Sequence, residues 1–215
     1  MKATVRQSSI PSVEKLFDKI ESSPSLSGYI NHFSDMLHGA NFSDKHATDL
    51  PKEAAIPRLL LELDRVRQQD GTIYLIGNGG SAAVASHIAN DFCNTSAMRA
   101  ITLHDPSILT CFTNDYGYAR AYAMLVERMA RPGDVLIAIS SSGQSSNILA
   151  AAQSMHNLGG TVITLSGFAA DNPLRVAGDM NIWVDSKAYG MVEVGHLLLL
   201  HYLADQLSKM VAQTR

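Results

Sequence analysis

The feature that most constrains the fold is a series of short apolar runs separated by helix-like stretches. The runs are TIYLI (72–76), ITL (101–103), DVLIAIS (134–140), TVITLS (161–166) and NIWV (181–184). Strands that are apolar on both faces and alternate with helices are typical of a parallel sheet covered on both sides. The sequence therefore predicts an α/β fold, a three-layer sandwich around a central parallel sheet.

The residues before this series have a different pattern. Three stretches have helical spacing: PSVEKLFDKIESS (11–23), SGYINHFSDMLHGA (27–40) and PKEAAIPRLLLELDRVRQQ (51–69), the last with Pro57 as a start, kink or interruption. We predict that residues from about 10 to 70 are helical and that no strand precedes Thr72. Residues 1–70 would then be an N-terminal helical region, packing on the domain and at an oligomer interface, and 71–215 the domain with the sheet.

Composition narrows the class of protein. The chain has 215 residues, 17 Lys and Arg against 20 Asp and Glu, and a net charge of -3, which disfavours nucleic-acid binding. No apolar run approaches the roughly 20 residues of a membrane span, and no signal peptide is visible. Cys93 and Cys111 lie in apolar surroundings without metal-ligand spacing, which predicts reduced core residues. We expect a cytoplasmic protein without nucleic-acid or membrane partners.

A glycine-rich turn, GNGGSAA (77–83), follows the first strand. Glycines bring backbone N–H groups close to a ligand, and the next helix begins with unpaired N–H groups that suit an anion. Gly77, Gly79 and Ala82 also satisfy the dinucleotide pattern G-x-G-x-x-A. That pattern requires an acidic residue about 20 positions later, and Asp105 comes too late for it. A simple tight turn remains the alternative.

The loop ISSSGQSSN (139–147) follows the strand DVLIAIS and has five serines in seven residues. Serine hydroxyls and a helix N-terminus bind an anion without a positive side chain. Two such loops on one sheet favour a site for a phosphate or phosphosugar between Gly79–Ser81 and Ser140–Ser145 over a serine-rich surface loop with a helix cap. Asn114 and Asp115 alone indicate an ordinary turn.

Histidines and carboxylates occur at helical spacing in two places. His87 and Asp91 are four residues apart and share a helix face, and Glu193 and His201 are eight apart on a long apolar helix. These four side chains could form a metal site or an acid–base pair. Buried or interface histidines are the alternative, which we prefer for His196.

The ordered motifs GNGGSAA…H…D, FTNDYGY, GDVLIAISSSGQSSNILAA, TVITLSG and EVGHLLLLH resemble the sugar isomerase (SIS) domain family, and within it the phosphoheptose isomerases. The resemblance spans residues from about Gly71 to Leu207. It implies a flavodoxin-like sandwich, a homotetramer with active sites at subunit interfaces, and a phosphosugar substrate. The implied reaction converts sedoheptulose 7-phosphate to D-glycero-D-manno-heptose 7-phosphate, or acts on a related sugar phosphate.

The resemblance also implies roles for individual residues. The expected substrate contacts, with Ser81 added from the anion prediction, are Asn78, Gly79, Gly80, Ser81, Asn114, Asp115, Ser140, Ser141, Ser142, Ser145 and Glu193. The family's catalytic glutamate and histidine correspond to Asp91 and His201. Its zinc ligands correspond to His87, Asp91, Glu193 and His201, so zinc or another divalent metal is the expected cofactor.

Several positions depart from the family's pattern. Asp91 occupies a position where the family has glutamate, and Glu193 one where it has glutamine. Likewise, Ser141 replaces threonine, Gln144 replaces asparagine, Thr95 replaces arginine, and Gly190 and Met191 replace aspartate and arginine. These changes leave two alternatives open: a non-catalytic SIS protein that binds a phosphosugar or a replication-initiator protein, and a sugar-phosphate sensor. The presence of His201 favours the enzyme, whereas Asp91 and Gly190 favour the non-catalytic protein.

Overall fold

The computed structural model describes residues 25–213, so the helix predicted within 11–23 lies outside the described residues. The chain divides into two compact units, Met1–Asp35 and Met36–Arg215. Helix α2 (Leu26–His38) is the one predicted from SGYINHFSDMLHGA, and it crosses the boundary between the units. The whole sheet belongs to the second unit.

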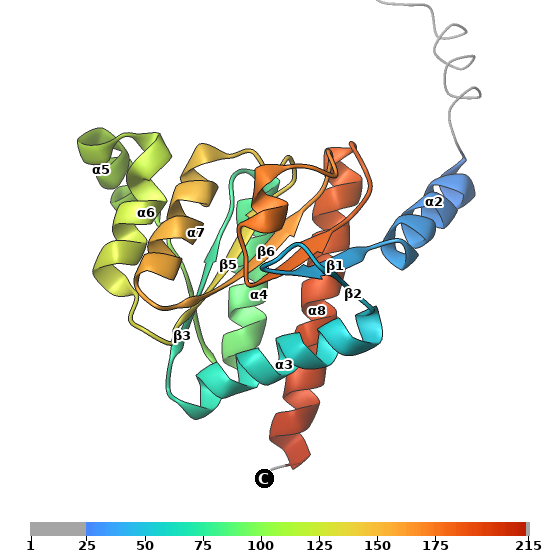
Figure 1. Ribbon diagram of the computed structural model, residues 1–215, viewed down its shortest axis with the longest axis horizontal. Coiled ribbons are helices and arrows are strands. Elements are labelled where there is room, and N and C mark those ends of the chain that lie inside the picture. The colour runs from blue at the N-terminus through green and yellow to red at the C-terminus, as the bar shows by residue number, and fades with distance from the viewer. Residues whose placement is uncertain (1–24, 214–215) are drawn as a thin grey trace, which may run out of the picture. The chain divides into compact units, whose positions relative to one another are not determined.

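The second unit is built on a seven-stranded, mostly parallel sheet (Figure 1). Its strands are β1 (Asn41–Asp44), β2 (Asp49–Leu50), β3 (Thr72–Ile76), β4 (Arg99–Thr102), β5 (Val135–Ser140), β6 (Thr161–Ser166) and β7 (Met180–Trp183). The spatial order is β2-β1-β7-β6-β5-β3-β4, and β3 to β7 form the parallel part. This parallel part is the sheet that the five apolar runs predicted.

The prediction that no strand precedes Thr72 is wrong. Strands β1 and β2 form an antiparallel hairpin, and β1 pairs antiparallel with β7, with Phe42 opposite Ile182. Phe42 is buried at 3% exposure, so the hairpin contributes to the core at this edge. A four-residue strand with one large apolar side chain gives too short a pattern to separate from a loop. The helix α3 (Lys52–Gln68) follows and continues through Pro57.

Helices cover both faces of the sheet (Figure 1). Helices α5 (Pro106–Tyr116), α6 (Tyr118–Met129) and α7 (Ser146–Asn157) lie on one side, and α3, α4 (Gly80–Asn94) and α8 (Tyr189–Gln213) on the other. Tyr74 and Ile76 of β3 pack in one core with residues of α6 and α7. Ile73 and Leu75 point to the opposite face and are also fully buried. The predicted three-layer sandwich is therefore confirmed.

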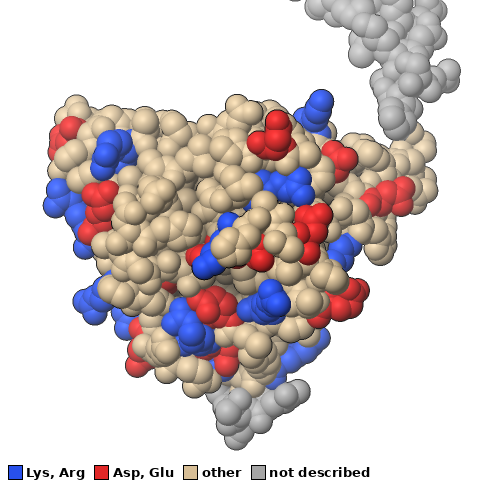
Figure 2. All heavy atoms as spheres, in the orientation of Figure 1, with Lys and Arg blue, Asp and Glu red and all other residues tan. Residues whose placement is uncertain are grey.

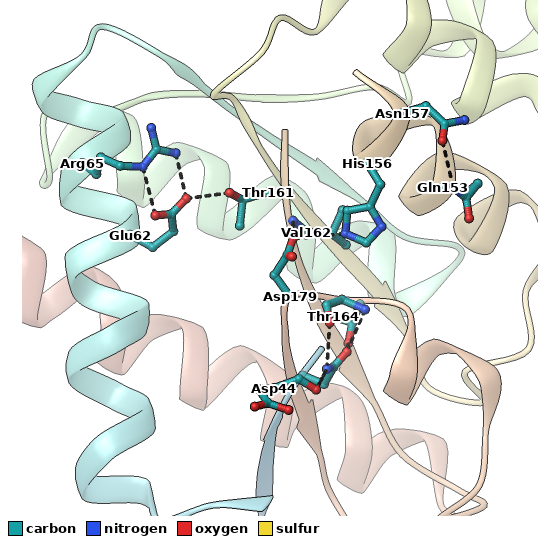
Figure 3. A network of polar contacts seen from close by, with 12 residues as sticks. Asp44, Glu62, Arg65, Gln153, His156, Asn157, Thr161, Val162, Thr164 and Asp179 are labelled. Carbon is teal, nitrogen blue, oxygen red and sulfur yellow. Dashed lines mark hydrogen bonds and ion pairs between the residues drawn. The ribbon is translucent and has the colours of Figure 1, made fainter. Parts of the chain in front are cut away.

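Polar contacts connect the layers and the strands (Figure 3). Thr161 of β6 donates a hydrogen bond to Glu62 of α3, which also pairs with Arg65. The pKa of Glu62 is lowered, chiefly by the hydrogen bonds from Arg65, so this carboxylate stays charged. Asp179, just before β7, accepts from the Val162 backbone N–H and lies 3.1 Å from His156. These contacts fix the amino end of β6 between α3, α7 and β7.

A buried carboxylate organises the amino ends of the parallel strands. Asp134, 5% exposed, accepts the N–H of Thr72 at Oδ1 and the N–H of Arg131 at Oδ2, both at 2.8 Å. Its carbonyl accepts from the N–H of Thr161 at 2.9 Å. One residue thus joins the starts of β3, β5 and β6.

Replacing Asp134 with alanine should destabilise the fold by about 2–6 kcal/mol, because two backbone N–H groups lose their acceptor and each costs roughly 1–3 kcal/mol. Denaturant unfolding followed by circular dichroism measures this change. The control Asp205→Ala removes an exposed carboxylate of α8 and should change stability by less than about 0.5 kcal/mol. Equal effects of the two substitutions would contradict the role given to Asp134.

Candidate active site

Helices α4 and α8 lie side by side and run in the same direction, and the site is built along them. Near their amino ends, a Cβ atom at Gly80 would lie only 2.2 Å from Oε2 of Glu193. Just past the end of α4, Ser96 donates to the carbonyl of Ala204 in α8 at 3.1 Å. The absence of a side chain at Gly80 leaves room for the Glu193 carboxylate in this position, and a larger residue would displace it.

Between these two contacts, three of the predicted side chains form a cluster. His201 Nδ1 lies 2.9 Å and His87 Nε2 lies 3.8 Å from Asp91 Oδ2, and the two imidazole rings are 4.9 Å apart. One donor atom from each residue falls within 4.8 Å of the others. His87 and Asp91 come from α4 and His201 from α8 of the same chain. The cluster is open to solvent, with the His87 side chain 55% exposed.

The donor set fits a zinc ion. Two imidazole nitrogens and one carboxylate oxygen are zinc ligands in proteins, and three protein ligands leave a position for water or substrate. Glu193, the fourth expected ligand, is not in this group, because its carboxylate lies at the amino end of α4 against Gly80. The structure thus brings three of the four candidates together and gives Glu193 a different position.

The Glu193 carboxylate lines a small cavity of about 150 Å³ at the carboxyl ends of the strands. The other residues around this cavity are Asn78, Ser81, Ser140, Ser141, Ser142, Ser145 and Tyr189. The amino end of α4 meets the serine loop here, as expected for the two loops of the sequence. Ser145 is the N-cap residue of α7, so two helix N-termini adjoin the cavity. Hydroxyl groups and helix dipoles of this kind suit an anion.

The serine loop has a defined conformation. The Ser140 and Ser145 hydroxyls lie 3.0 Å apart, and the Gly143 N–H donates to the Ser140 carbonyl. Ser142 Oγ accepts from the Gln144 N–H at 3.3 Å. The Ser141 hydroxyl is buried, and no partner for it occurs within residues 25–213. A buried hydroxyl without a partner carries a desolvation cost, which a ligand oxygen in this cavity would relieve.

The first loop is also held by side chains. Gly79 has a φ of 54° and is the N-cap residue of α4. Asn78 exchanges two hydrogen bonds with Asn147 of α7, at 3.0 and 2.9 Å, and accepts one from the Tyr118 hydroxyl at 2.7 Å. The hydroxyl of Tyr122 donates to the Gly77 carbonyl. These contacts fix the turn before any ligand binds.

Three residues of this site were missed by sequence reasoning. Tyr189 lines the cavity, and Asn147 and Tyr118 hold Asn78. Asn147 belongs to the SSN triplet that ends the serine loop, so its polar side chain could have been recognised as a support for that loop. In the structure it is buried, at 2% exposure. Tyr189 and Tyr118 each begin a helix, and nothing in the local sequence distinguishes them from surface residues.

Asn114 and Asp115 do not line the cavity. They lie in the last turn of α5, so the prediction of an ordinary turn is wrong, and both are exposed. Their side chains bond to each other, from Asn114 Nδ2 to Asp115 Oδ1 at 3.0 Å. Asp105, which was considered for a dinucleotide ribose, instead caps α5 by accepting the N–H groups of Ser107 and Ile108.

The two cysteines are free, as predicted, but the prediction that they are core residues is wrong. Cys93 and Cys111 are both exposed. Cys93 Sγ donates to the Ala100 carbonyl at the edge strand β4, and Cys111 lies on the surface of α5. Apolar neighbours in the sequence misled the prediction, because neighbouring residues of a helix point to different sides.

His196 is fully buried, in agreement with the preference for a core residue. Its Nε2 lies 3.0 Å from the carbonyl of Ser166, to which the neutral ring donates, while Nδ1 has no partner within residues 25–213. Burial lowers the pKa of His196 to about 4, and the bond to Ser166 opposes this shift only in part.

His196 should therefore make stability depend on pH. The unfolded chain binds the proton more readily, so stability is lost as the pH falls from about 6.5 towards 4. At about 1.4 kcal/mol for each pKa unit, the loss is roughly 3 kcal/mol. Unfolding of metal-free protein should show this loss relative to His196→Gln, which does not titrate. An equal pH dependence of the two proteins would contradict it.

Zinc binding provides a direct test of the cluster. Mutation of residues that merely orient a metal ligand costs about 10- to 100-fold in affinity, so loss of a ligand should cost more than about 100-fold. We expect that weakening in His201→Ala and Asp91→Ala by calorimetry with zinc on metal-stripped protein. The control His46→Ala removes an exposed histidine outside the cluster. Zinc binding that is equally tight in all variants would show that the cluster is not the site.

The surface in Figure 2 has Lys and Arg interspersed with Asp and Glu, without a broad region of one sign on the face shown. Within residues 25–213, no helix combines the length and the apolar character that a membrane span requires.

Comparisons with known proteins agree with this geometry. Residues 51–167 match the SIS domain family. The phosphoheptose isomerase of Roseiflexus sp. (strain RS-1) is 36% identical over 164 residues, which are 74% of this chain and 81% of that protein. The structure of a phosphoheptose isomerase from Neisseria gonorrhoeae has a TM-score of 0.68 at 27% identity and covers 90% of this chain and 99% of its own.

A phosphoheptose isomerase structure from Francisella tularensis shares the fold, with a TM-score of 0.72 at 24% identity over 93% of this chain and 100% of that one. The family match covers more than half of this chain, and the sequence relative is similar over most of both proteins. The chain therefore belongs to the SIS domain family and, within it, to the phosphoheptose isomerases.

Proposed function

We propose that the protein is an isomerase that interconverts the aldose and ketose forms of a phosphorylated sugar. The substrate is sedoheptulose 7-phosphate, converted to D-glycero-D-manno-heptose 7-phosphate, or a related sugar phosphate. The observation that carries this proposal is the 2.9 Å contact between His201 Nδ1 and Asp91 Oδ2, which pairs an acid–base histidine with a carboxylate. The relatives named phosphoheptose isomerase support the same reaction.

The reaction moves a proton between C1 and C2 through an enediolate, so it needs a base at carbon and an acid at oxygen. Asp91 is the base and His201 the acid–base partner at the sugar oxygens. Both imidazoles face Oδ2 of Asp91, which leaves Oδ1 for the proton on carbon. This division lets one carboxylate hold the cluster together and still accept a proton.

The donor set of His87, Asp91 and His201 suits a zinc ion. When bound, zinc would supply Lewis-acid polarisation of the sugar carbonyl and stabilise the enediolate oxygen. The protein's own contribution is orientation. Because His87 and Asp91 are one helical turn apart on α4, the helix fixes their side chains on one face. Their position does not depend on a flexible loop.

The serine-lined cavity is the proposed phosphate site. Hydroxyls of Ser142 and Ser145 and the amino ends of α4 and α7 provide the donors. Glu193 is an opposing feature, because a carboxylate in the same cavity repels a phosphate. We therefore infer that the phosphate lies against the serines and that Glu193 faces hydroxyl groups of the sugar.

A homotetramer with sites at subunit interfaces is part of the proposal. Val194, Leu198 and Tyr202 form an apolar stripe at spacings of four residues along α8, with exposures of 53%, 46% and 46%. His201 comes three residues after Leu198 and seven after Val194, which places it on the same side of α8, so a second copy that covers the stripe would also enclose the open side of the cluster. Exclusion of water by such a copy would strengthen the electrostatic interactions of the site.

Hydrogen exchange tests the chemistry directly. With zinc, deuterated water and sedoheptulose 7-phosphate, the protein should introduce deuterium at the sugar carbon, which mass spectrometry detects. Asp91→Asn keeps the shape of the side chain but removes its basicity, so exchange should fall by about 100- to 10,000-fold. The control Asp205→Asn makes the same chemical change at an exposed position of α8 and should leave exchange unchanged.

If the protein binds ketose phosphates of five to seven carbons but catalyses no exchange, with or without zinc, the proposed isomerase activity is refuted. That result would favour the non-catalytic alternative, a protein that senses a phosphosugar.

A further inference from the structure

A second polar cavity, of about 280 Å³, lies at the amino ends of the parallel strands. It is enclosed by the turn after α3, the amino ends of β3 and β4, the end of α6 and the loop before β5. The serine-lined cavity lies at the carboxyl ends of β3 and β5 instead. Strands of five and six residues separate the two cavities, a length of roughly 15–20 Å.

Two arginines line this second cavity without a charged partner. Arg99 begins β4 opposite Thr72 of β3, and Arg131 begins the loop before β5. Neither forms a salt bridge within residues 25–213, whereas Arg65 and Arg67 of the neighbouring helix pair with Glu62 and Asp64. Both side chains are exposed. Two free guanidinium groups at one cavity make it a candidate anion site.

Two acidic residues, Asp70 and Asp134, also line the cavity. Neither forms a salt bridge with the arginines within residues 25–213, and both oxygens of the Asp134 carboxylate accept backbone N–H groups. The pKa of Tyr74 is raised, first by burial and then by Asp134, while Arg131 and Arg99 act in the opposite direction. Tyr74 also lines the cavity, and its hydroxyl donates to the Met129 carbonyl at 2.8 Å.

We propose that this cavity binds the phosphate ester of a small hydroxylated metabolite, at a site separate from the active site. The planar guanidinium groups of Arg99 and Arg131 hold the phosphate through paired N–H donors. Asp70 and Gln69, on the same rim, accept hydrogen bonds from hydroxyl groups. A volume of about 280 Å³ is at the lower limit for ligand sites, which restricts the ligand to a compact molecule.

The test is calorimetry with ribose 5-phosphate as the probe. The wild type should bind two molecules per chain, one in each cavity. In Arg99→Gln/Arg131→Gln, one site should weaken at least about 10-fold, because charge-assisted hydrogen bonds are lost. Exchange activity should be unchanged, since neither arginine belongs to the active site. The control Arg58→Gln removes an exposed arginine of α3 that forms no salt bridge within residues 25–213 and does not line the cavity, so this variant should keep both sites.

The variant Ser142→Ala/Ser145→Ala separates this proposal from the proposed function. Loss of one site in the serine variant and of the other in the arginine variant supports both. If only the serine variant loses binding, the second site is refuted and the proposed phosphate site stands. If only the arginine variant loses binding, the second site stands and the serine-lined site is refuted. Equal binding by the Arg99→Gln/Arg131→Gln and Arg58→Gln proteins would also refute the proposal.

Discussion

The packing of α4 against α8 in the same direction is the constraint on which the candidate active site depends. The Glu193 carboxylate lies against Gly80 at the amino ends of the helices, and the Ser96 hydroxyl joins them again beyond the cluster. Between these contacts, the face of α4 that carries His87 and Asp91 meets His201. The cluster is therefore held by two rigid helices of one chain, which is a more accurate support than a loop.

The two ends of α4 carry different chemistry. Its amino end contributes a helix dipole and borders hydroxyl groups, which suit a phosphate without a lysine or arginine. Its carboxyl half presents imidazole and carboxylate groups, which suit a metal or a proton transfer. The cavity lined by Arg99 and Arg131 lies at the amino ends of the strands. The cavity lined by hydroxyl groups and the cavity lined by guanidinium groups thus lie at opposite ends of the parallel strands.

Sequence patterns predicted the parts of the fold with strong periodicity. Five apolar runs gave the parallel strands, and the spacing of His87 and Asp91 placed both on one helix face. The β1–β2 hairpin was missed because a short edge strand owes its position to pairing with β7, which is distant in the sequence. The position of the Glu193 carboxylate could not be predicted from the sequence either. The eight-residue spacing in α8 places Glu193 and His201 along one helix, but it does not determine which residues of α4 each side chain contacts.

Helix α4 connects the anion cavity to the histidine cluster, so the number of residues between them determines both the distance and the relative orientation of the two groups. A residue inserted between Gly80 and His87 would rotate everything after it by about 100° around the helix axis and advance it by about 1.5 Å. His87 and Asp91 would then turn away from His201, although every residue of the cluster was still present. Insertions and deletions should therefore be tolerated better in connecting loops that border neither cavity than within this helical segment.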